Sequence, residues 1–182
     1  CLLNGAFSNH RKRTDYVRSR GLILLDSFNY NTVLEFSENI DLKDVEPFTL
    51  LTLDYSSGKL TEFYEFRWDG ENKYLKKLGQ TTNQIWSSAT LYSPAIQDAR
   101  QQLFSDWLLK NEESEDKLIL NFHNRKHGLS LNEDILMKGE DDLRTLSISQ
   151  IHFQNSKAVF NYFDIEKNKE YKLKLINSLT HA

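Results

Sequence analysis

The only cysteine of the chain is its first residue, Cys1, so a thiol and an α-amine stand side by side. A thiolate is a strong nucleophile, and a neighbouring amine can take up its proton, as in enzymes whose nucleophile is an N-terminal residue. The same cysteine also fits an ordinary position in a short apolar strand, CLLN, that ends at Asn4-Gly5. The residues alone therefore leave a nucleophilic and a structural interpretation of Cys1 open.

Other polar side chains stand where predicted strands or helices begin or end. Four stretches share this property: Asn4-Gly5, Tyr16–Gly21, Trp86–Thr90 and Arg144-Thr145. Small polar groups that converge on a cleft from the ends of strands are the usual sign of a binding or catalytic site. We therefore predict a pocket lined by Asn4, Trp86, Ser87, Ser88 and Arg144. The structural alternatives are that Asn4 caps a turn and that Arg144 pairs with Asp141 or Asp142.

The sequence lacks most of the motifs that indicate a known catalytic or nucleotide-binding chemistry. It has no P-loop, GxGxxG, GxSxG or HExxH motif. His123 and His127 are four residues apart and could share one face of a helix, but no third ligand stands nearby. We therefore predict neither a metal site nor a cofactor, and we interpret Trp68 and Trp107 as packing residues.

The charge balance argues against nucleic acid as a partner. The chain of 182 residues has 23 Lys and Arg against 26 Asp and Glu, a net charge of −3. Its basic cluster, His10–Arg13 with Arg18 and Arg20, fits a solvated surface, with phosphate or carboxylate binding as the alternative. No apolar run is long enough to span a bilayer, and one cysteine favours a reducing compartment, so we predict a cytoplasmic protein that binds a small molecule.

Hydrophobic periodicity predicts an α+β domain with mainly antiparallel sheet. Leu22, Leu25 and Phe28 have helical spacing, while Leu60–Trp68 alternates with a period of two and leads into a turn at Asp69-Gly70. Helices are predicted at 20–28, 31–39, 94–110 and 115–123, and Ser19 can cap the first of them while Pro94 lies just inside the start of the third. Strands are predicted at 1–4, 48–55, 60–68, 73–78, 85–88, 144–153, 157–164 and 170–175. We expect those at 48–55, 60–68 and 73–78 to form an antiparallel meander and those at 144–153 and 157–164 to form a hairpin.

Several stretches, in this order along the chain, resemble the bacterial branch of the NRDE family, which is named for transport and Golgi organisation protein 2. They are CLLNGAF, YVRSRGLILLDSF, PFTLLTLDY, FRWDG, IWSSATLYSP and RTLSISQI. The resemblance implies that residues 1–182 form a single NRDE-family domain. It also implies the fold of the N-terminal-nucleophile hydrolases, an αββα sandwich in which two antiparallel sheets stack between layers of helices.

The sequence departs from the family pattern at its start. Family members begin with Met-Cys and continue to an Asn-Arg-Asp-Glu loop, and neither is present here; Asn132–Asp134 lies in the wrong region and lacks the arginine. The resemblance therefore implies an N-terminally truncated domain, without the first strands and the NRDE loop. It places the catalytic nucleophile upstream of residue 1 and Cys1 at an internal strand position. It therefore also implies that residues 1–182 are an inactive fragment.

The resemblance also suggests roles for three of the predicted pocket residues. Asn4 matches an asparagine whose amide could donate to an oxyanion. Ser88 falls where some members have a second asparagine, so the second amide donor of those members is weakened or absent here. Arg144 matches an arginine at the start of the late strand, and in related hydrolases such an arginine supports the nucleophile electrostatically. The implied function is amide hydrolysis or acyl transfer. The alternatives are a non-catalytic small-ligand protein that binds or carries haem or lipid, and a plain interaction domain.

Overall fold

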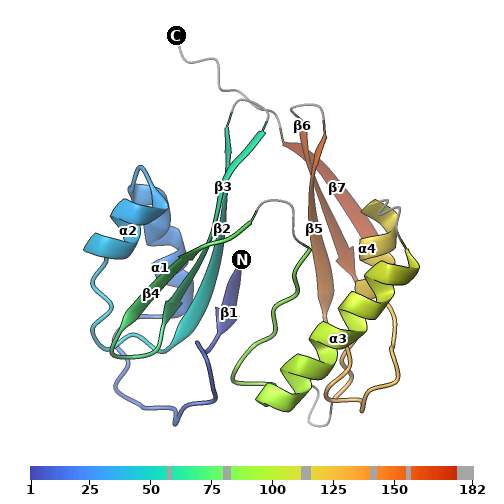
Figure 1. Ribbon diagram of the computed structural model, residues 1–182, viewed down its shortest axis with the longest axis horizontal. Coiled ribbons are helices and arrows are strands. Elements are labelled where there is room, and N and C mark those ends of the chain that lie inside the picture. Colours follow the sequence, from blue (N-terminus) through green and yellow to red (C-terminus); the bar gives the residue numbers. More distant parts are fainter. Residues whose placement is uncertain (57–58, 80–82, 112–115, 140–142, 155–156, 176–182) are drawn as a thin grey trace. The chain divides into compact units, whose positions relative to one another are not determined.

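The computed structural model describes the chain except for residues 57–58, 80–82, 112–115, 140–142, 155–156 and 176–182. The described residues form an α+β protein with two antiparallel sheets and four α-helices, as predicted (Figure 1). The chain divides into two compact units. The first unit comprises Cys1–Ser56 and Leu60–Gln101, and the second comprises Ser57–Lys59 and Gln102–Ala182.

The first sheet has four strands in the order β1-β2-β3-β4. The strands are β1 (Leu2–Asn4), β2 (Phe48–Ser56), β3 (Lys59–Trp68) and β4 (Lys73–Lys77). Leu2 lies opposite Leu50 in the antiparallel β1–β2 pair, and Phe66 lies opposite Leu75 in the antiparallel β3–β4 pair. The turn between β3 and β4 is closed by the Asp69 carboxylate, which accepts hydrogen bonds from two backbone N–H groups of the turn. The predicted meander is confirmed.

Two short helices, α1 (Arg20–Asp26) and α2 (Val33–Asn39), follow the basic loop, with a single 3₁₀ turn, η1 (Ser27–Asn29), between them. Each α-helix starts with a side-chain cap, as the sequence suggests for Ser19. The Ser19 hydroxyl accepts from the N–H of Leu22 at 3.4 Å, and the Thr32 hydroxyl accepts from the N–H of Glu35 at 3.0 Å.

The apolar stripe of the first helix is exposed, because α1 packs through a different face. Ile23 is fully buried, whereas Leu22, Leu25 and Phe28 are 48%, 60% and 78% exposed. The segment GLILLDSF is apolar on nearly every side, so spacing alone does not show which face reaches the core.

Aromatic side chains build the core of the first unit. Phe66 of β3 makes edge-to-face contacts with Phe36 of α2 and Phe48 of β2, with ring centroids 5.5 and 5.8 Å apart. Trp68 joins this core, and its indole N–H donates to the carbonyl of Val45 at 2.9 Å. The core therefore fixes the helix-bearing face of the first sheet.

The second sheet has three strands in the order β5-β6-β7, which confirms the predicted late hairpins. They are β5 (Ser147–Gln154), β6 (Lys157–Asp164) and β7 (Lys169–Leu175). The helices are α3 (Pro94–Lys110), which begins in the first unit and continues into the second, and α4 (Asp116–His123). Phe104 and Trp107 of α3 each lie 5.2 Å from the ring of Phe122 in α4, and this aromatic cluster forms the core of the second unit.

Two predicted strand positions are wrong. Residues 85–88 form no strand, because their side chains hydrogen-bond to other segments instead of their backbone pairing in a sheet. The late strand begins at Ser147, not at Arg144. Before that point Thr145 bonds with Met137 through its backbone N–H and its hydroxyl, and the backbone of Arg144 pairs with Lys138 in an isolated β-bridge.

Candidate functional site

Two of the predicted pocket residues, Asn4 and Ser88, are in direct contact. The buried Ser88 hydroxyl donates to the backbone carbonyl of Asn4 at 2.9 Å and lies 3.1 Å from the hydroxyl of Thr90. Asn4 is the last residue of β1 and is exposed. Within the part of the chain that the structure describes, its side-chain amide makes no hydrogen bond. The strand end is thus held by its backbone while its amide is open to a ligand.

Glycine is required at the next position, as the Asn4-Gly5 turn signal suggests. Gly5 has φ +80°, and a Cβ atom there would lie 3.0 Å from a methyl group of Thr90 and 3.1 Å from the Cβ of Ala89. The Thr49 hydroxyl donates to the Gly5 carbonyl at 2.9 Å. Close packing of residues 89–90 on this turn fixes the direction in which the chain leaves Asn4.

Trp86 belongs to a charged network on the same sheet. Its indole N–H donates to the carboxylate of Glu65 at 2.7 Å, and the guanidinium of Arg67 bonds to the same oxygen at 2.8 Å. Arg67 also donates to the carbonyl of Ala6 and stacks on the ring of Phe7. Partial burial disfavours ionisation of Glu65, but the bonds from Arg67 and Trp86 hold its pKa below the ordinary value. Glu65 is therefore a fixed anion.

Sequence reasoning did not assign Glu65 and Arg67 to the site, although a signal was present. The alternation of β3 places both on the face opposite Tyr64 and Phe66, where the charges stand two residues apart. This face of the strand also bears the apolar Phe63. A carboxylate and a guanidinium beside an apolar side chain indicate a partly buried ion pair.

Ser87 contacts a buried arginine of α3. The Nε of Arg100 donates to the Ser87 hydroxyl at 2.8 Å, and the guanidinium lies 4.2 Å from the centre of the Tyr92 ring. Arg100 is buried, with 8% of its surface exposed. Four of the predicted pocket residues thus contact other segments of the first unit. Asn4 and Ser88 contact each other, Trp86 bonds to Glu65 of β3, and Ser87 bonds to Arg100 of α3.

Arg144, the fifth predicted residue, belongs to the second unit. Its guanidinium forms an ion pair with Glu166, with Nε 3.1 Å from the carboxylate, at an exposed position. The proposed alternative partners Asp141 and Asp142 lie outside the described residues. A common pocket of Arg144 with the other four residues therefore stays a prediction.

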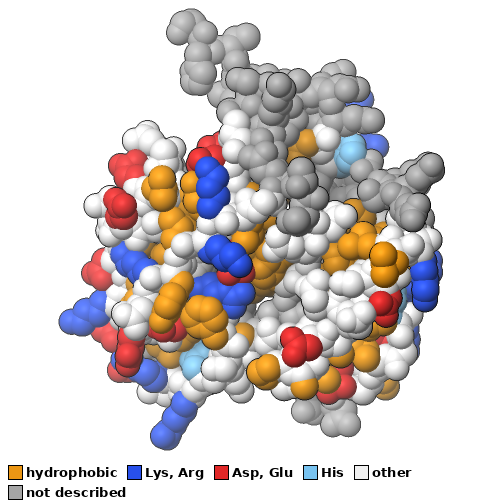
Figure 2. Space-filling model, in the orientation of Figure 1, with side chains coloured by type: hydrophobic (Ala, Val, Ile, Leu, Met, Phe, Trp, Pro, Cys, Tyr) orange, Lys and Arg blue, Asp and Glu red, His pale blue; other side chains and the backbone are white. Residues whose placement is uncertain are grey.

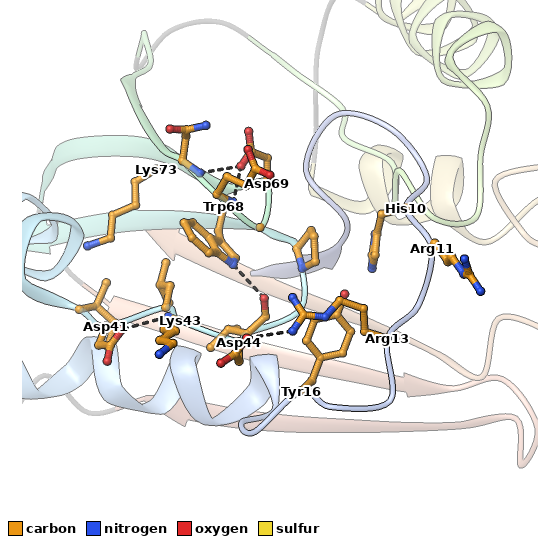
Figure 3. Close-up of a pocket in the computed structure, with 17 residues that line it drawn as sticks. His10, Arg11, Arg13, Tyr16, Asp41, Lys43, Asp44, Trp68, Asp69 and Lys73 are labelled. Atoms are coloured by element: carbon orange, nitrogen blue, oxygen red, sulfur yellow. Dashed lines mark hydrogen bonds and ion pairs between the residues drawn. The ribbon is translucent and has the colours of Figure 1, made fainter.

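Three members of the basic cluster, His10, Arg11 and Arg13, line a pocket of about 760 Å³ in the first unit, together with residues 40–45, Pro47 and the β3–β4 turn (Figure 3). Arg13 crosses it to bond with Asp44 at 2.9 Å and also pairs with Asp15. Four cationic and four acidic side chains line the pocket: Arg11, Arg13, Lys43, Lys73 and Asp41, Asp44, Asp69, Glu71. Because these charges balance, the pocket has no net attraction for an anion.

The histidine pair has a structural explanation. His127 Nε2 lies 2.8 Å from the carbonyl of Phe122, so this nitrogen carries the proton and donates. The buried carboxylate of Asp134 accepts from the backbone N–H groups of His127, Gly128 and Ile135. Within the described ranges no cluster of side chains could hold a metal ion.

No family model, curated protein or solved structure matches this chain. Among the described residues, no helix has the length and apolar character needed to cross a membrane. The chemistry of the site is therefore argued from its own contacts.

Proposed function

We propose that this chain carries a small-molecule site of the NRDE type, in which the amide of Asn4 donates to a carbonyl or carboxylate oxygen of the ligand. The observation that carries this proposal is the contact between Asn4 and Ser88. It holds the strand end by its backbone carbonyl and leaves an exposed amide without an internal hydrogen bond. Such a pre-positioned donor suits an oxygen that bears, or develops, negative charge.

We propose further that the fold is the αββα sandwich of the N-terminal-nucleophile hydrolases. Features of each sheet support this. The first sheet has an aromatic core on the face that receives α2. In the second sheet Ile151, Phe160 and Leu173 stand opposite one another on neighbouring strands, and Ile151 and Leu173 are more than half exposed. An apolar sheet face of this kind normally lies inside a layered domain.

The activity proposed for such a site is amide hydrolysis or acyl transfer. A thiolate would attack the ligand's carbonyl carbon, and the oxygen that becomes negative would accept a hydrogen bond from Asn4. Collapse of this intermediate would break the C–N bond, and the amine would leave with a proton. Water or a second acceptor would then take the acyl group from sulfur and restore the thiolate. We assign no nucleophile to the described residues. The first property to test is therefore the binding of an amide-containing ligand.

A non-catalytic ligand-binding or trafficking protein is the second candidate, and the state of Ser88 favours it. Its hydroxyl is buried and already donates to the Asn4 carbonyl, so it offers no second donor to an oxyanion. One amide donor is enough to orient a carbonyl group, whereas oxyanion holes usually use at least two donors.

Asparagine-selective ¹⁵N labelling with N-acetylglycine as the probe tests the proposal. The side-chain resonance of Asn4 is identified by its loss in Asn4→Ala. We expect this resonance to shift on titration, and we expect Asn4→Ala to weaken binding by about tenfold, the value of one good hydrogen bond to an anion. The matched control is Asn9→Ala, which changes another exposed asparagine of the first unit and should leave binding unchanged.

The same samples separate the two candidate functions. Release of glycine from bound N-acetylglycine would support the hydrolase, whereas binding without release agrees with the ligand-binding protein and equally with a hydrolase domain that lacks its nucleophile. If the Asn4 resonance does not move, or if Asn4→Ala binds the probe as tightly as the parent chain, the proposed site is wrong.

A further inference from the structure

The end of β1 contains the one asparagine of the chain that precedes a glycine, Asn4-Gly5. An asparagine can cyclise when the backbone nitrogen of the next residue attacks its side-chain carbonyl carbon, because this nucleophile is already close to its target. Glycine favours the attack, since it has no side chain to hinder the approach and its backbone is the most flexible. Every other asparagine precedes a residue with a side chain, so the local sequence makes Asn4 the most reactive of them.

The side chain of Asn4 is open to this reaction. Asn4 is exposed, and within the part of the chain that the structure describes its amide makes no hydrogen bond that would hold it away from the backbone. Water also reaches an exposed side chain, and water is the second reactant of the conversion. The side chain itself therefore provides no protection.

The backbone of the same strand end opposes the reaction. The N–H of the buried Gly5 donates to the carbonyl of Pro47 at 3.0 Å. The Gly5 carbonyl accepts from the hydroxyl of Thr49 at 2.9 Å, and the Asn4 carbonyl accepts from the hydroxyl of Ser88 at 2.9 Å. The attacking nitrogen is thus held in a hydrogen bond, and Asn4 has the extended backbone of β1 instead of the turn that a five-membered ring requires.

We propose that Asn4-Gly5 is a latent modification site, at which the folded strand end preserves the Asn4 amide and opening of that end converts it to aspartate and isoaspartate. After release from Pro47, the Gly5 nitrogen forms a bond to Cγ of Asn4 and gives up its proton to solvent. The C–N bond of the amide breaks, and the nitrogen takes up a proton and leaves as ammonia.

Water then opens the succinimide ring that this step produces. Addition of water to the side-chain carbonyl breaks its bond to the Gly5 nitrogen and gives aspartate. Addition to the main-chain carbonyl breaks the other C–N bond and gives isoaspartate, in which the main chain runs through the former side chain. The overall reaction consumes one water molecule, releases one ammonia and involves no oxidant or reductant.

Both products replace a neutral hydrogen-bond donor with a carboxylate, which at neutral pH only accepts. Modified chains should therefore no longer donate to a ligand oxygen at this position. This consequence rests on the proposed function, whereas the modification itself depends only on the strand end.

Incubation of the chain at mildly alkaline pH, with and without urea at a concentration that unfolds it, tests the proposal. Trypsin releases residues 1–11, and fragmentation in the mass spectrometer assigns the mass gain to Asn4 or to Asn9. We expect Asn4 to be modified at least about tenfold more slowly in the folded chain, because the open strand end is a minor population. Asn9 is the internal control, since it is also exposed but precedes His10, and it should react far more slowly than Asn4 in urea.

A substitution at the anchor of the turn tests the protection directly. Thr49→Val removes the hydroxyl that donates to Gly5 and should speed the modification of Asn4 in the folded chain by about threefold or more. The matched control is Thr61→Val, which removes a hydroxyl that donates to the carbonyl of Asp54 in the same unit and should leave the rate unchanged. Circular dichroism shows whether each variant is folded.

The proposal is overturned if Asn4 is not modified in urea, or if it is modified as fast in the folded chain as in urea. The comparison of the parent chain with and without urea decides this even if Thr49→Val does not fold. A folded Thr49→Val with the rate of Thr61→Val would refute the protection by the anchored turn. Failure of N-acetylglycine to bind unmodified chain would contradict the proposed function alone, because the mass measurement does not depend on a ligand.

Discussion

The two sheets of this protein are stabilised in different ways. The first sheet buries one face in an aromatic core and carries a hydrogen-bonded network of charged residues on the other, where Arg67 and Glu65 hold Trp86 and Ala6. The second unit concentrates its buried aromatic residues at α3 and α4, and its sheet presents Ile151, Tyr171 and Leu173, which are each more than half exposed. Figure 2 shows hydrophobic and charged side chains side by side on one face of the molecule.

This contrast shows where a specific site can form. Apolar packing alone leaves a sheet face uniform, whereas the charged face of the first sheet fixes individual groups in one geometry through directional bonds. The candidate site lies at the strand ends beside that network. The most useful experiments therefore compare matched changes in the two units.

Removing a core ring should have the largest effect. Phe66→Ala deletes a fully buried ring that contacts Phe36 and Phe48, and it should lower the free energy of unfolding by about 3–5 kcal/mol. Phe122→Ala should cost as much in the second unit, while Leu173→Ala at an exposed position should cost less than about 1 kcal/mol. Urea denaturation measures all three. A large effect of Leu173→Ala would show that its sheet face is covered.

The buried carboxylate of the second unit should come next. Asp134→Ala leaves the N–H groups of His127, Gly128 and Ile135 without their acceptor and should cost about 3 kcal/mol. Asp134→Asn keeps one acceptor oxygen and should cost less. Hydrogen exchange of these amides provides the measurement, and equal protection in the parent chain and Asp134→Ala would contradict this role.

Two of the glycines with positive φ, Gly5 and Gly128, separate backbone strain from steric contact. Gly5→Ala adds a methyl group 3.0 Å from Thr90 at φ +80°, and it should cost about 2 kcal/mol. At Gly128 the backbone has φ +91°, and an added Cβ atom would meet no other atom within 4 Å. Gly128→Ala should therefore cost only the backbone strain, about 1 kcal/mol of the free energy of unfolding. Thermal unfolding compares the two. Equal costs would mean that residues 89–90 do not pack tightly on the turn.

The ion pair of the first sheet should give the smallest effect, and it should depend on pH. The pKa of Glu65 is lower in the folded chain than the ordinary 4.5, so its contribution to stability is complete above that value and is lost as the pH falls through the lowered pKa. Between neutral pH and about pH 3 the parent chain should therefore lose more stability than Glu65→Gln.

The matched control for Glu65 is Glu166→Gln, which alters the exposed pair with Arg144 and should leave the pH dependence of stability nearly unchanged. If Glu65→Gln and the parent chain lose the same stability on acidification, the network on the first sheet contributes no stability through ionised Glu65.

Much of the architecture could be predicted from the sequence, because local patterns determine it. The antiparallel sheets could be predicted from three local features: the alternation in β3, the Asp69-Gly70 turn and the spacing of the late strands. Ser19 and Pro94 marked the starts of two helices, since capping and proline geometry depend only on neighbouring residues. Asn4 and Ser88 do lie in contact, as the predicted pocket requires, although Ser88 does not stand at a strand end.

Only the tertiary structure decided how individual side chains are used. The apolar helix α1 offered several possible core faces, and packing against the first sheet selected Ile23 and left Leu25 and Phe28 exposed. Residues 85–88 have strand-like composition, but the side-chain bonds of Trp86 and Ser88 to partners far away in the chain keep them out of a sheet. The burial of Arg100 and the position of the Arg67–Glu65 pair likewise depend on contacts with segments distant in the sequence. A local pattern shows which residues can form an element, whereas the partners of each charge are decided when distant segments meet.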